Sequence, residues 1–280
     1  MQRLRELVKL FINLYYKIYS FALRVMGIID FPVPPNSNMR RTSAKTIKHY
    51  IYSSTTTGLP ISVGAQMHGV SFNEGCRVLD FGCGCASQLR YFLKNHPKAD
   101  YYGNDIDPST VQWVAENYPK VNTGVNKPEG PLSHESDFFD LAYTVSTFSH
   151  FNKPDVDHWL AELSRVLKPN GILIATIEGS GAIDLVAKES QADMSQIKAD
   201  LDKMGIHFKN YEWLNEGQQR SGALTKSVDI ASYFGSEYGH TLMTIDYFSR
   251  QAKSFGLELL SSAERVICDR QDMVIFRKVK

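Results

Sequence analysis

Arg77-Val-Leu-Asp-Phe-Gly-Cys-Gly-Cys-Ala-Ser-Gln-Leu-Arg-Tyr-Phe92 is the stretch that decides the fold of this chain. Its first residues form a short apolar run that Gly82 and Gly84 interrupt, as in a buried strand that ends in a tight turn. Beyond the turn, Leu89 and Phe92 recur at helical spacing. Glycine lets the backbone approach a bound molecule, and the first amides of a helix are open to that molecule. The stretch therefore predicts a strand, a ligand-binding turn and a helix.

Two classes of cofactor-binding protein use a turn of this kind. Dinucleotide-binding enzymes have a third glycine where this chain has Ser87, and their helix start holds a pyrophosphate. Asp80, directly before the turn, would repel a pyrophosphate and favours a cationic ligand. The order Asp80-Phe81-Gly82-Cys83-Gly84 resembles the first motif of the class I S-adenosylmethionine-dependent methyltransferases. The resemblance implies that these five residues bind S-adenosyl-L-methionine as the cofactor.

The next two strands carry further candidates for the cofactor site. Asp105 follows Gly82 by 23 residues, at the end of a second strand, where a carboxylate can accept both hydroxyls of a ribose. This spacing alone would suit NAD as well, and the pairing with Asp80 favours S-adenosylmethionine. The resemblance extends the predicted contacts to Ile106, and to the backbone of Val145 and Ser146 after the fourth strand.

The pattern of the whole chain predicts an α/β fold. Strands and helices alternate up to Ile172–Ile177, and the last strands form a hairpin, which is foreign to dehydrogenases. We expect the Rossmann-like sheet of a class I methyltransferase, mostly parallel with an antiparallel hairpin at its carboxyl-terminal end, and helices on both faces. The middle of the chain resembles bacterial methyltransferases associated with glycan or lipid modification.

The sequence divides into an extension and a domain. We expect an amphipathic helix and a Pro-rich linker over residues 1–39, and a cofactor-binding domain over residues 40–280. A helix over 43–57, capped by Ser43 and ended by Gly58-Leu-Pro, should be followed by a short helix over 61–70. An insertion at about 180–240, with a helix over 186–204 and an aromatic loop, is expected to cover the acceptor substrate; a dimer contact is the alternative.

Residues 3–29 have a narrow cationic stripe and a wide apolar face. Lys9, Lys17 and Arg24 interrupt the apolar run too often for a membrane-spanning helix, and no small-residue cleavage site follows. Two interpretations remain open. The helix packs on the protein's own core or on a second copy, or it lies in a membrane interface. We expect a cytoplasmic protein, with a peripheral position at the inner membrane face under the second interpretation.

Charge and cysteine content exclude other classes. Residues 1–50 carry a net charge of +7, which leaves the other 230 residues at −6, so attraction to nucleic acid is not expected. Four cysteines, three of them near the glycine turn, do not make a disulfide framework, and a reducing compartment fits them. A Cys-x-Cys pair without suitable partners makes a poor zinc site, so we expect no metal.

His150 is the candidate catalytic residue. It follows the fourth strand, at the edge of the sheet where ligands bind, and a histidine is the best base for an acceptor hydroxyl. A helix-start or packing role is the alternative, and His240 and Glu178 are second choices. The expected activity is methyl transfer to a hydroxyl oxygen of a sugar, glycolipid or other small molecule. N-methylation of a small molecule or protein, and cofactor binding without catalysis, stay as alternatives.

Overall fold

A seven-stranded sheet forms the centre of the molecule. The computed structural model describes residues 29–41, 46–190, 193–210 and 238–279, together with part of the stretch 11–27. The strand order is β3-β2-β1-β4-β5-β9-β8, with β1 to β5 parallel and β9 antiparallel to both its neighbours. The strands are β1 (Arg77–Phe81), β2 (Asp100–Asp105), β3 (Val121–Val125), β4 (Phe139–Thr144), β5 (Leu167–Ile177), β8 (Leu257–Ile267) and β9 (Gln271–Lys278). The predicted fold class is confirmed, terminal hairpin included.

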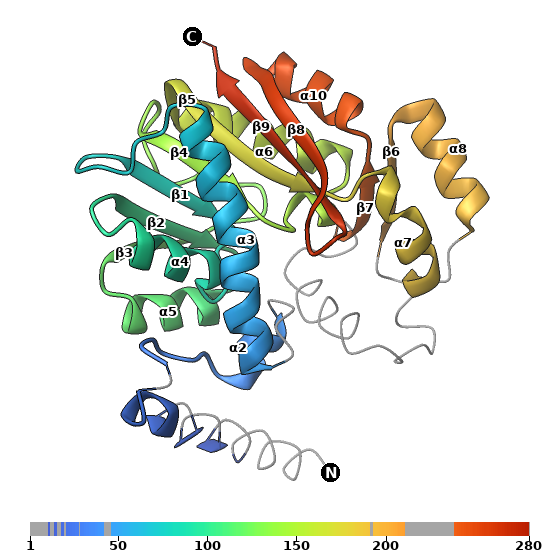
Figure 1. Ribbon diagram of the computed structural model, residues 1–280. Helices are drawn as coiled ribbons and strands as arrows, with labels where there is room; N and C mark the ends of the chain where they lie inside the picture. Colours follow the sequence, from blue (N-terminus) through green and yellow to red (C-terminus); the bar gives the residue numbers. More distant parts are fainter. Residues whose placement is uncertain are drawn as a thin grey trace.

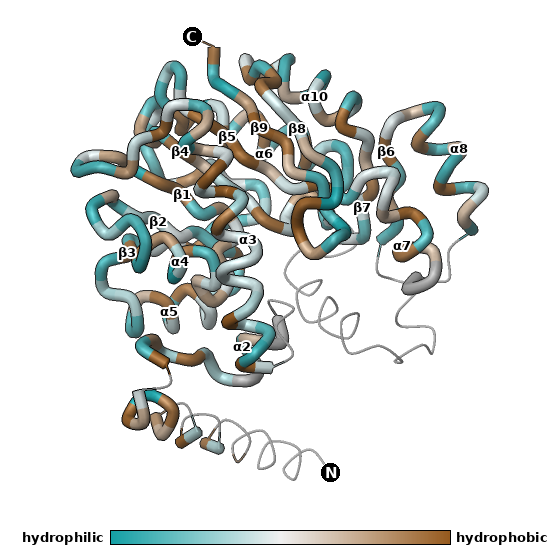
Figure 2. The backbone as a smooth tube through the Cα atoms, in the orientation of Figure 1, coloured by the Kyte–Doolittle hydropathy of each residue, from teal (hydrophilic) through white to brown (hydrophobic). Residues whose placement is uncertain are grey.

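Helices cover both faces of this sheet (Figure 1). One hydrophobic core joins the sheet to α3 (Ile47–Met67), α4 (Ser87–Asn95) and α5 (Pro108–Asn117). A second core joins the opposite face to α6 (Lys153–Val166) and α10 (Ile245–Ser254). Because both faces are covered, most residues of the central strands β1 and β4 and of the second half of β5 are buried, and these strands contain hydrophobic stretches that are brown in Figure 2.

Capping residues set where the helices begin. Asp107 caps α5 by accepting a hydrogen bond from the Ser109 amide at 2.9 Å. Asn152 does the same for α6 through the Asp155 amide at 2.9 Å. For α3 the cap is Thr46, whose Oγ1 accepts from the His49 amide. The predicted cap Ser43 lies outside the described residues.

Helix α3 runs through Gly58 and Pro60, so the prediction that it ends there is wrong. The two helices expected over 43–57 and 61–70 are one. Packing explains the continuation: a Cβ on Gly58 would lie 2.6 Å from the Tyr91 ring, so the glycine allows α3 to pass close to α4. A glycine that reads as a helix end in the sequence is here a point of helix contact.

The insertion after β5 forms a small layer of its own. It contains α7 (Ile183–Ser190), α8 (Met194–Met204) and β6 (Ile206–Asn210), which pairs antiparallel with β7 (Gly239–Met243). The prediction of a single helix over 186–204 is therefore wrong, because two helices occupy this stretch. Their buried residues share a small core with β7. Most of the predicted aromatic loop, residues 211–237, lies outside the described residues.

The amino-terminal stretch joins the domain near α4. The Phe31 side chain is buried, and the Arg90 guanidinium lies 3.8 Å from the centre of its ring. The predicted Pro-rich linker is extended only in part, because α2 (Asn36–Arg41) begins within it. Described residues from 11 to 25 are helical. Within the described part of the chain, no helix has both the length and the apolarity to cross a bilayer.

Candidate active site

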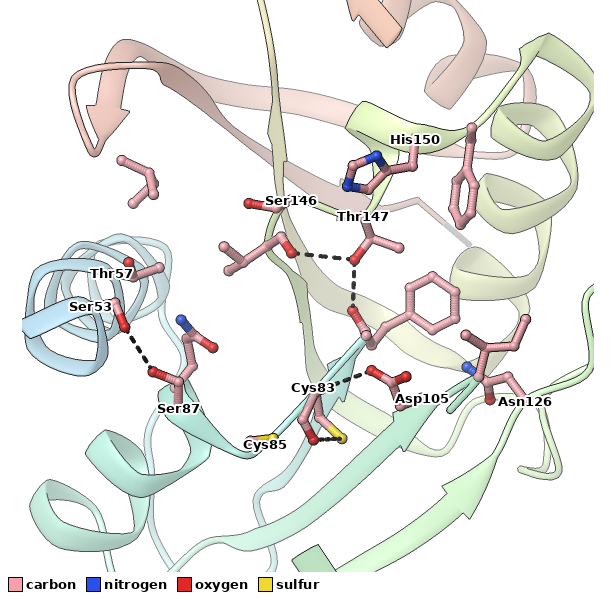
Figure 3. A pocket seen from close by; sticks show the side chains of 18 of the residues that line it. Ser53, Thr57, Cys83, Cys85, Ser87, Asp105, Asn126, Ser146, Thr147 and His150 are labelled. Atoms are coloured by element: carbon pink, nitrogen blue, oxygen red, sulfur yellow. Dashed lines mark hydrogen bonds between the residues drawn. The ribbon is translucent and has the colours of Figure 1, made fainter. Parts of the chain in front are cut away.

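A cavity of about 260 Å³ opens at the carboxyl ends of β1, β2 and β4 (Figure 3). This is the edge at which parallel sheets bind ligands. The structure brings nine of the ten predicted site residues to the cavity lining, all except Asp80. They are Phe81, Gly82, Cys83, Gly84, Asp105, Ile106, Val145, Ser146 and His150.

The glycine turn shapes one side of this cavity. Gly82 and Gly84 have φ angles of +83° and +49°, which favour glycine. The Gly82 amide donates to the Asn104 carbonyl at 2.8 Å, and this bond ties the turn to β2. A Cβ on Gly82 would collide with Oγ1 of Thr147. The turn thus needs glycine both for its conformation and for its close approach to the loop after β4.

Asp105 lies at the end of β2, in the cavity lining. Its Oδ2 accepts from the Gly84 amide at 2.7 Å and its Oδ1 from the Asp107 amide at 2.9 Å. Burial raises the pKa of this carboxyl, and the two amides act in the opposite direction. Figure 3 shows Asp105 and Asn126 at one end of the cavity and His150 at the other. A fixed carboxylate with remaining acceptor capacity suits a pair of ligand hydroxyls.

Asp80 lies beneath the turn, with 1% of its surface exposed. Its Oδ2 accepts from the Tyr143 hydroxyl at 3.0 Å. Burial is the largest influence on the carboxyl and raises its pKa to about 8, although the Tyr143 hydrogen bond acts to lower it. In the absence of a cation, Asp80 is therefore mostly protonated at pH 7. Asp80 does not line the cavity, so it can favour a cationic ligand only through its charge, once the presence of that ligand has ionised the carboxyl.

His150 ends the 3₁₀ turn η1 (Phe148–His150), directly after β4. Its Nδ1 lies 3.1 Å from the Gly239 carbonyl oxygen, which can only accept, so Nδ1 carries the proton and the lone pair is on Nε2. The ring stacks on Tyr238 with the ring centres 4.8 Å apart. Burial, followed by the nearby His240, lowers the pKa of His150 to about 4. The ring is therefore neutral at pH 7.

The structure adds lining residues that sequence reasoning missed. Tyr238 comes from the end of the insertion, Ile267 ends β8, and Cys268 lies in the β8–β9 turn. Phe151 directly follows the 3₁₀ turn η1, and Trp159 lies on the buried face of α6. The Ser146 amide donates to Oγ1 of Thr176, which shows how β5 fixes the loop after β4. The sequence could have predicted the place of the β8–β9 turn. A terminal strand that runs antiparallel to β5 begins at the edge of the sheet where β5 ends, which is the edge that binds ligands.

Comparison with known proteins bears on the identity of this site. Residues 78–171 match a family model described as "Methyltransferase domain". Malonyl-[acyl-carrier protein] O-methyltransferase of Hahella chejuensis is 29% identical over 125 residues, which are 42% of this chain and 43% of that protein. Cyclopropane-fatty-acyl-phospholipid synthase of Escherichia coli is 27% identical over 116 residues, 41% of this chain and 30% of that protein. These matches thus span less than half the length of either curated relative.

A solved structure supports the same fold. It is that of Burkholderia thailandensis 1,6-didemethyltoxoflavin-N1-methyltransferase with bound S-adenosylhomocysteine, at a TM-score of 0.52 and 13% identity. The match covers 90% of this chain and 94% of that one.

The site fits S-adenosylmethionine. Its glycine turn leaves no room for a Cβ at Gly82, and the Asp105 carboxylate lies at the edge of the cavity beside the turn. Residues 78–171 thus match a methyltransferase domain, and the sheet order and the lining of the cavity agree with binding of S-adenosylmethionine at this site.

Proposed function

We propose that this protein methylates a hydroxyl oxygen of a sugar, glycolipid or other small molecule, with His150 as the general base. The observation that carries the proposal is the hydrogen bond from Nδ1 of His150 to the Gly239 carbonyl at 3.1 Å. It sets the tautomer in which Nε2 accepts a proton, and His150 lines the same cavity as the cofactor-binding turn.

Each residue then has a definite task. S-adenosylmethionine supplies, when bound, a methyl group already activated by its sulfonium. Asp105 accepts the hydroxyls of the ribose, and the glycine turn holds the cofactor close to β1. The aromatic rings of Phe151, Trp159 and Tyr238 exclude water from the other end of the cavity. His150 would orient the acceptor hydroxyl and take its proton on Nε2 as the oxygen–carbon bond forms, while the bond between that methyl carbon and sulfur breaks and S-adenosylhomocysteine leaves.

The composition of the cavity supports an acceptor with both apolar and hydroxyl groups. Five residues with phenyl, phenol or indole rings line it with Ile267, namely Tyr50, Phe81, Phe151, Trp159 and Tyr238, and hydroxyl-bearing residues such as Thr147 line it too. Rings of this kind stack on sugars or acyl chains, and hydroxyls orient polar groups. The names of the two curated relatives refer to a malonyl group on a carrier protein and to a fatty-acyl phospholipid, which supports an acceptor with an acyl part and does not bear on the hydroxyl itself.

The test is methyl transfer from cofactor carrying a tritiated methyl group to a panel of glycolipids, free sugars, fatty acids and amines. We expect label in hydroxyl compounds, bound as an ether that survives mild alkali. Label in amines, or in an alkali-labile ester of a carboxylic acid, would refute the hydroxyl acceptor. The His150→Gln variant is the matched control, since it removes the base and keeps a polar side chain.

We propose further that residues 3–29 contact a membrane surface. Large apolar side chains of the described residues are strongly exposed, at 61–70% for Phe11, Tyr15, Ile18, Phe21 and Val25. Exposure of this extent is unlike packing on the protein's own core. Basic residues lie along the same stretch, so it suits an anionic lipid surface. Self-association through the same residues is the alternative.

A further inference from the structure

Glu178, directly after β5, is a buried carboxylate with two cationic or proton-donating partners. Its Oε1 accepts from Nε of Arg270 at 2.7 Å, and its Oε2 accepts from Nη2 of Arg270 at 3.1 Å. His240 places its Nε2 2.7 Å from Oε2. The side chain of Glu178 is 5% exposed, and these partners lower its pKa to about 2 against the opposing influence of burial. The carboxylate is therefore ionised over the working pH range.

His240, the first partner of Glu178, belongs to one wall of the end of the cavity lined by His150 and Tyr238, which we call the acceptor end. His240 is the second residue of β7, next to Gly239, whose carbonyl holds Nδ1 of His150. Tyr238, one residue earlier, stacks on the His150 ring. The position of β7 therefore decides where the His150 ring lies and which nitrogen carries its proton.

The Arg270 partner belongs to the opposite wall. Arg270 lies in the β8–β9 turn, beside β7 in Figure 1, and this turn brings Ile267 and Cys268 to the cavity lining. Cys268 and Asp269 have φ angles of +56° and +53°, a conformation that disfavours residues with a Cβ. Such a turn persists only where surrounding contacts hold it. The bidentate bond from Arg270 to Glu178 is such a contact.

We propose that Glu178 is a positioning residue that fastens both walls of the acceptor end of the cavity to β5, and that it thereby fixes the tautomer of His150. We call the three side chains Glu178, His240 and Arg270 the Glu178 bridge. The inference rests on the proposed function insofar as this end of the cavity is where the acceptor binds. It assigns Glu178 and His240, second choices for the base in the sequence, to support of His150.

The Glu178→Gln variant tests the bridge, because it keeps the shape of the side chain and removes its charge. The readout is the ring nitrogen signals of His150 by nuclear magnetic resonance, assigned by their loss in His150→Gln. In the unaltered protein we expect a single tautomer with Nδ1 protonated. In the variant we expect the Nε2-protonated tautomer to appear, and the pKa of His150 to rise from about 4 toward its ordinary 6.5 as water enters.

The direction in which the pKa of His150 changes distinguishes a loss of positioning from the loss of the Glu178 charge alone. Loss of the Glu178 charge alone would lower the pKa of His150 further, since that charge favours the imidazolium. An unchanged tautomer with an unchanged or lower pKa would therefore overturn the proposal. Asp140→Asn is the matched control: it breaks the 2.7 Å ion pair with Lys168 at the start of β4, and should leave His150 unaltered.

A second variant keeps the test decisive if Glu178→Gln fails to fold. His240→Leu, which has no hydrogen-bonding group, breaks only the link to β7 and leaves the Glu178–Arg270 pair in place. The tautomer is its readout, because removal of His240 raises the pKa of His150 directly. A single, unchanged tautomer in His240→Leu refutes the bridge.

These measurements use neither cofactor nor acceptor, so the two proposals can fail separately. If the bridge behaves as expected and no hydroxyl compound is methylated, the proposed function alone fails. If hydroxyl compounds are methylated and Glu178→Gln leaves the tautomer and the pKa of His150 unaltered, the bridge alone fails.

Discussion

Replacement of Asp80 by Asn should stabilise the free protein and weaken cofactor binding. The Asp80 carboxyl has a pKa of about 8 in the folded protein against 3.8 in its ordinary state. A folded-state pKa above the unfolded value means stability that is fully present below pH 3.8 and lost as pH rises toward 8. Over the three pH units to pH 7, the loss is about 4 kcal/mol at 1.36 kcal/mol per unit. Asn cannot ionise and still accepts from Tyr143, so the variant should recover most of this loss.

Cofactor binding should respond in the opposite sense. A cationic ligand near Asp80 favours the ionised carboxyl, and at pH 7 that ionisation costs about 1.4 kcal/mol, one pKa unit. The affinity for S-adenosylmethionine should therefore rise about tenfold between pH 7 and pH 9, with release of nearly one proton at pH 7. The Asn variant should lack this contribution. The ligand's own amino group titrates in both proteins, so the difference between them isolates Asp80.

Two assays measure these opposite effects. Urea unfolding at pH 4 and pH 7 gives the free energy of unfolding, and the advantage of Asp80→Asn should be large only at pH 7. Calorimetry in two buffers of different ionisation heat gives the affinity and the number of protons released. If unfolding and binding show the same pH dependence in both proteins, Asp80 does not change its ionisation, and the electrostatic argument for a cationic ligand is refuted.

Three further predictions concern catalysis, the turn and the amino-terminal stretch. His150→Gln should lower the rate of methyl transfer by about 10²- to 10⁴-fold, the usual contribution of a general base, without a change in cofactor affinity measured by calorimetry. Gly82→Ala should abolish calorimetric cofactor binding, because its Cβ meets Thr147 and its φ of +83° disfavours alanine; binding at the original affinity would contradict the account of the turn. Deletion of residues 1–30 should abolish sedimentation with anionic liposomes, and failure of the intact chain to bind them would rule out the membrane contact.

The sequence predicted the cofactor side of the site because local patterns determine it. Gly82 and Gly84 follow a buried strand directly, and Asp105 ends the next strand, so a parallel sheet must bring them together. The terminal hairpin was predictable for a similar reason, since two strands close in sequence pair with each other. These features depend on short segments and on the rules of strand order.

The features that the sequence did not predict depend on contacts between residues far apart in the chain. In the sequence, Gly58 indicates the end of a helix. In the structure it packs against the Tyr91 ring, and this tertiary contact outweighs the low helix propensity of glycine. Glu178 was only a candidate base, because nothing near it in sequence indicates that His240 and Arg270 bind it from two directions. Tyr238 reaches His150 through the pairing of β6 with β7 across the insertion, which no short pattern predicts.

Calorimetry with S-adenosylmethionine, S-adenosylhomocysteine and NAD tests the central claim most directly, with the unaltered protein and Asp105→Ala. The account predicts that both sulfur ligands bind and that NAD does not. It also predicts that Asp105→Ala weakens the binding of both sulfur ligands by at least about tenfold, because a charge-assisted hydrogen bond contributes roughly 1.5–3 kcal/mol. Binding of NAD without binding of either sulfur ligand would contradict the assignment of the site.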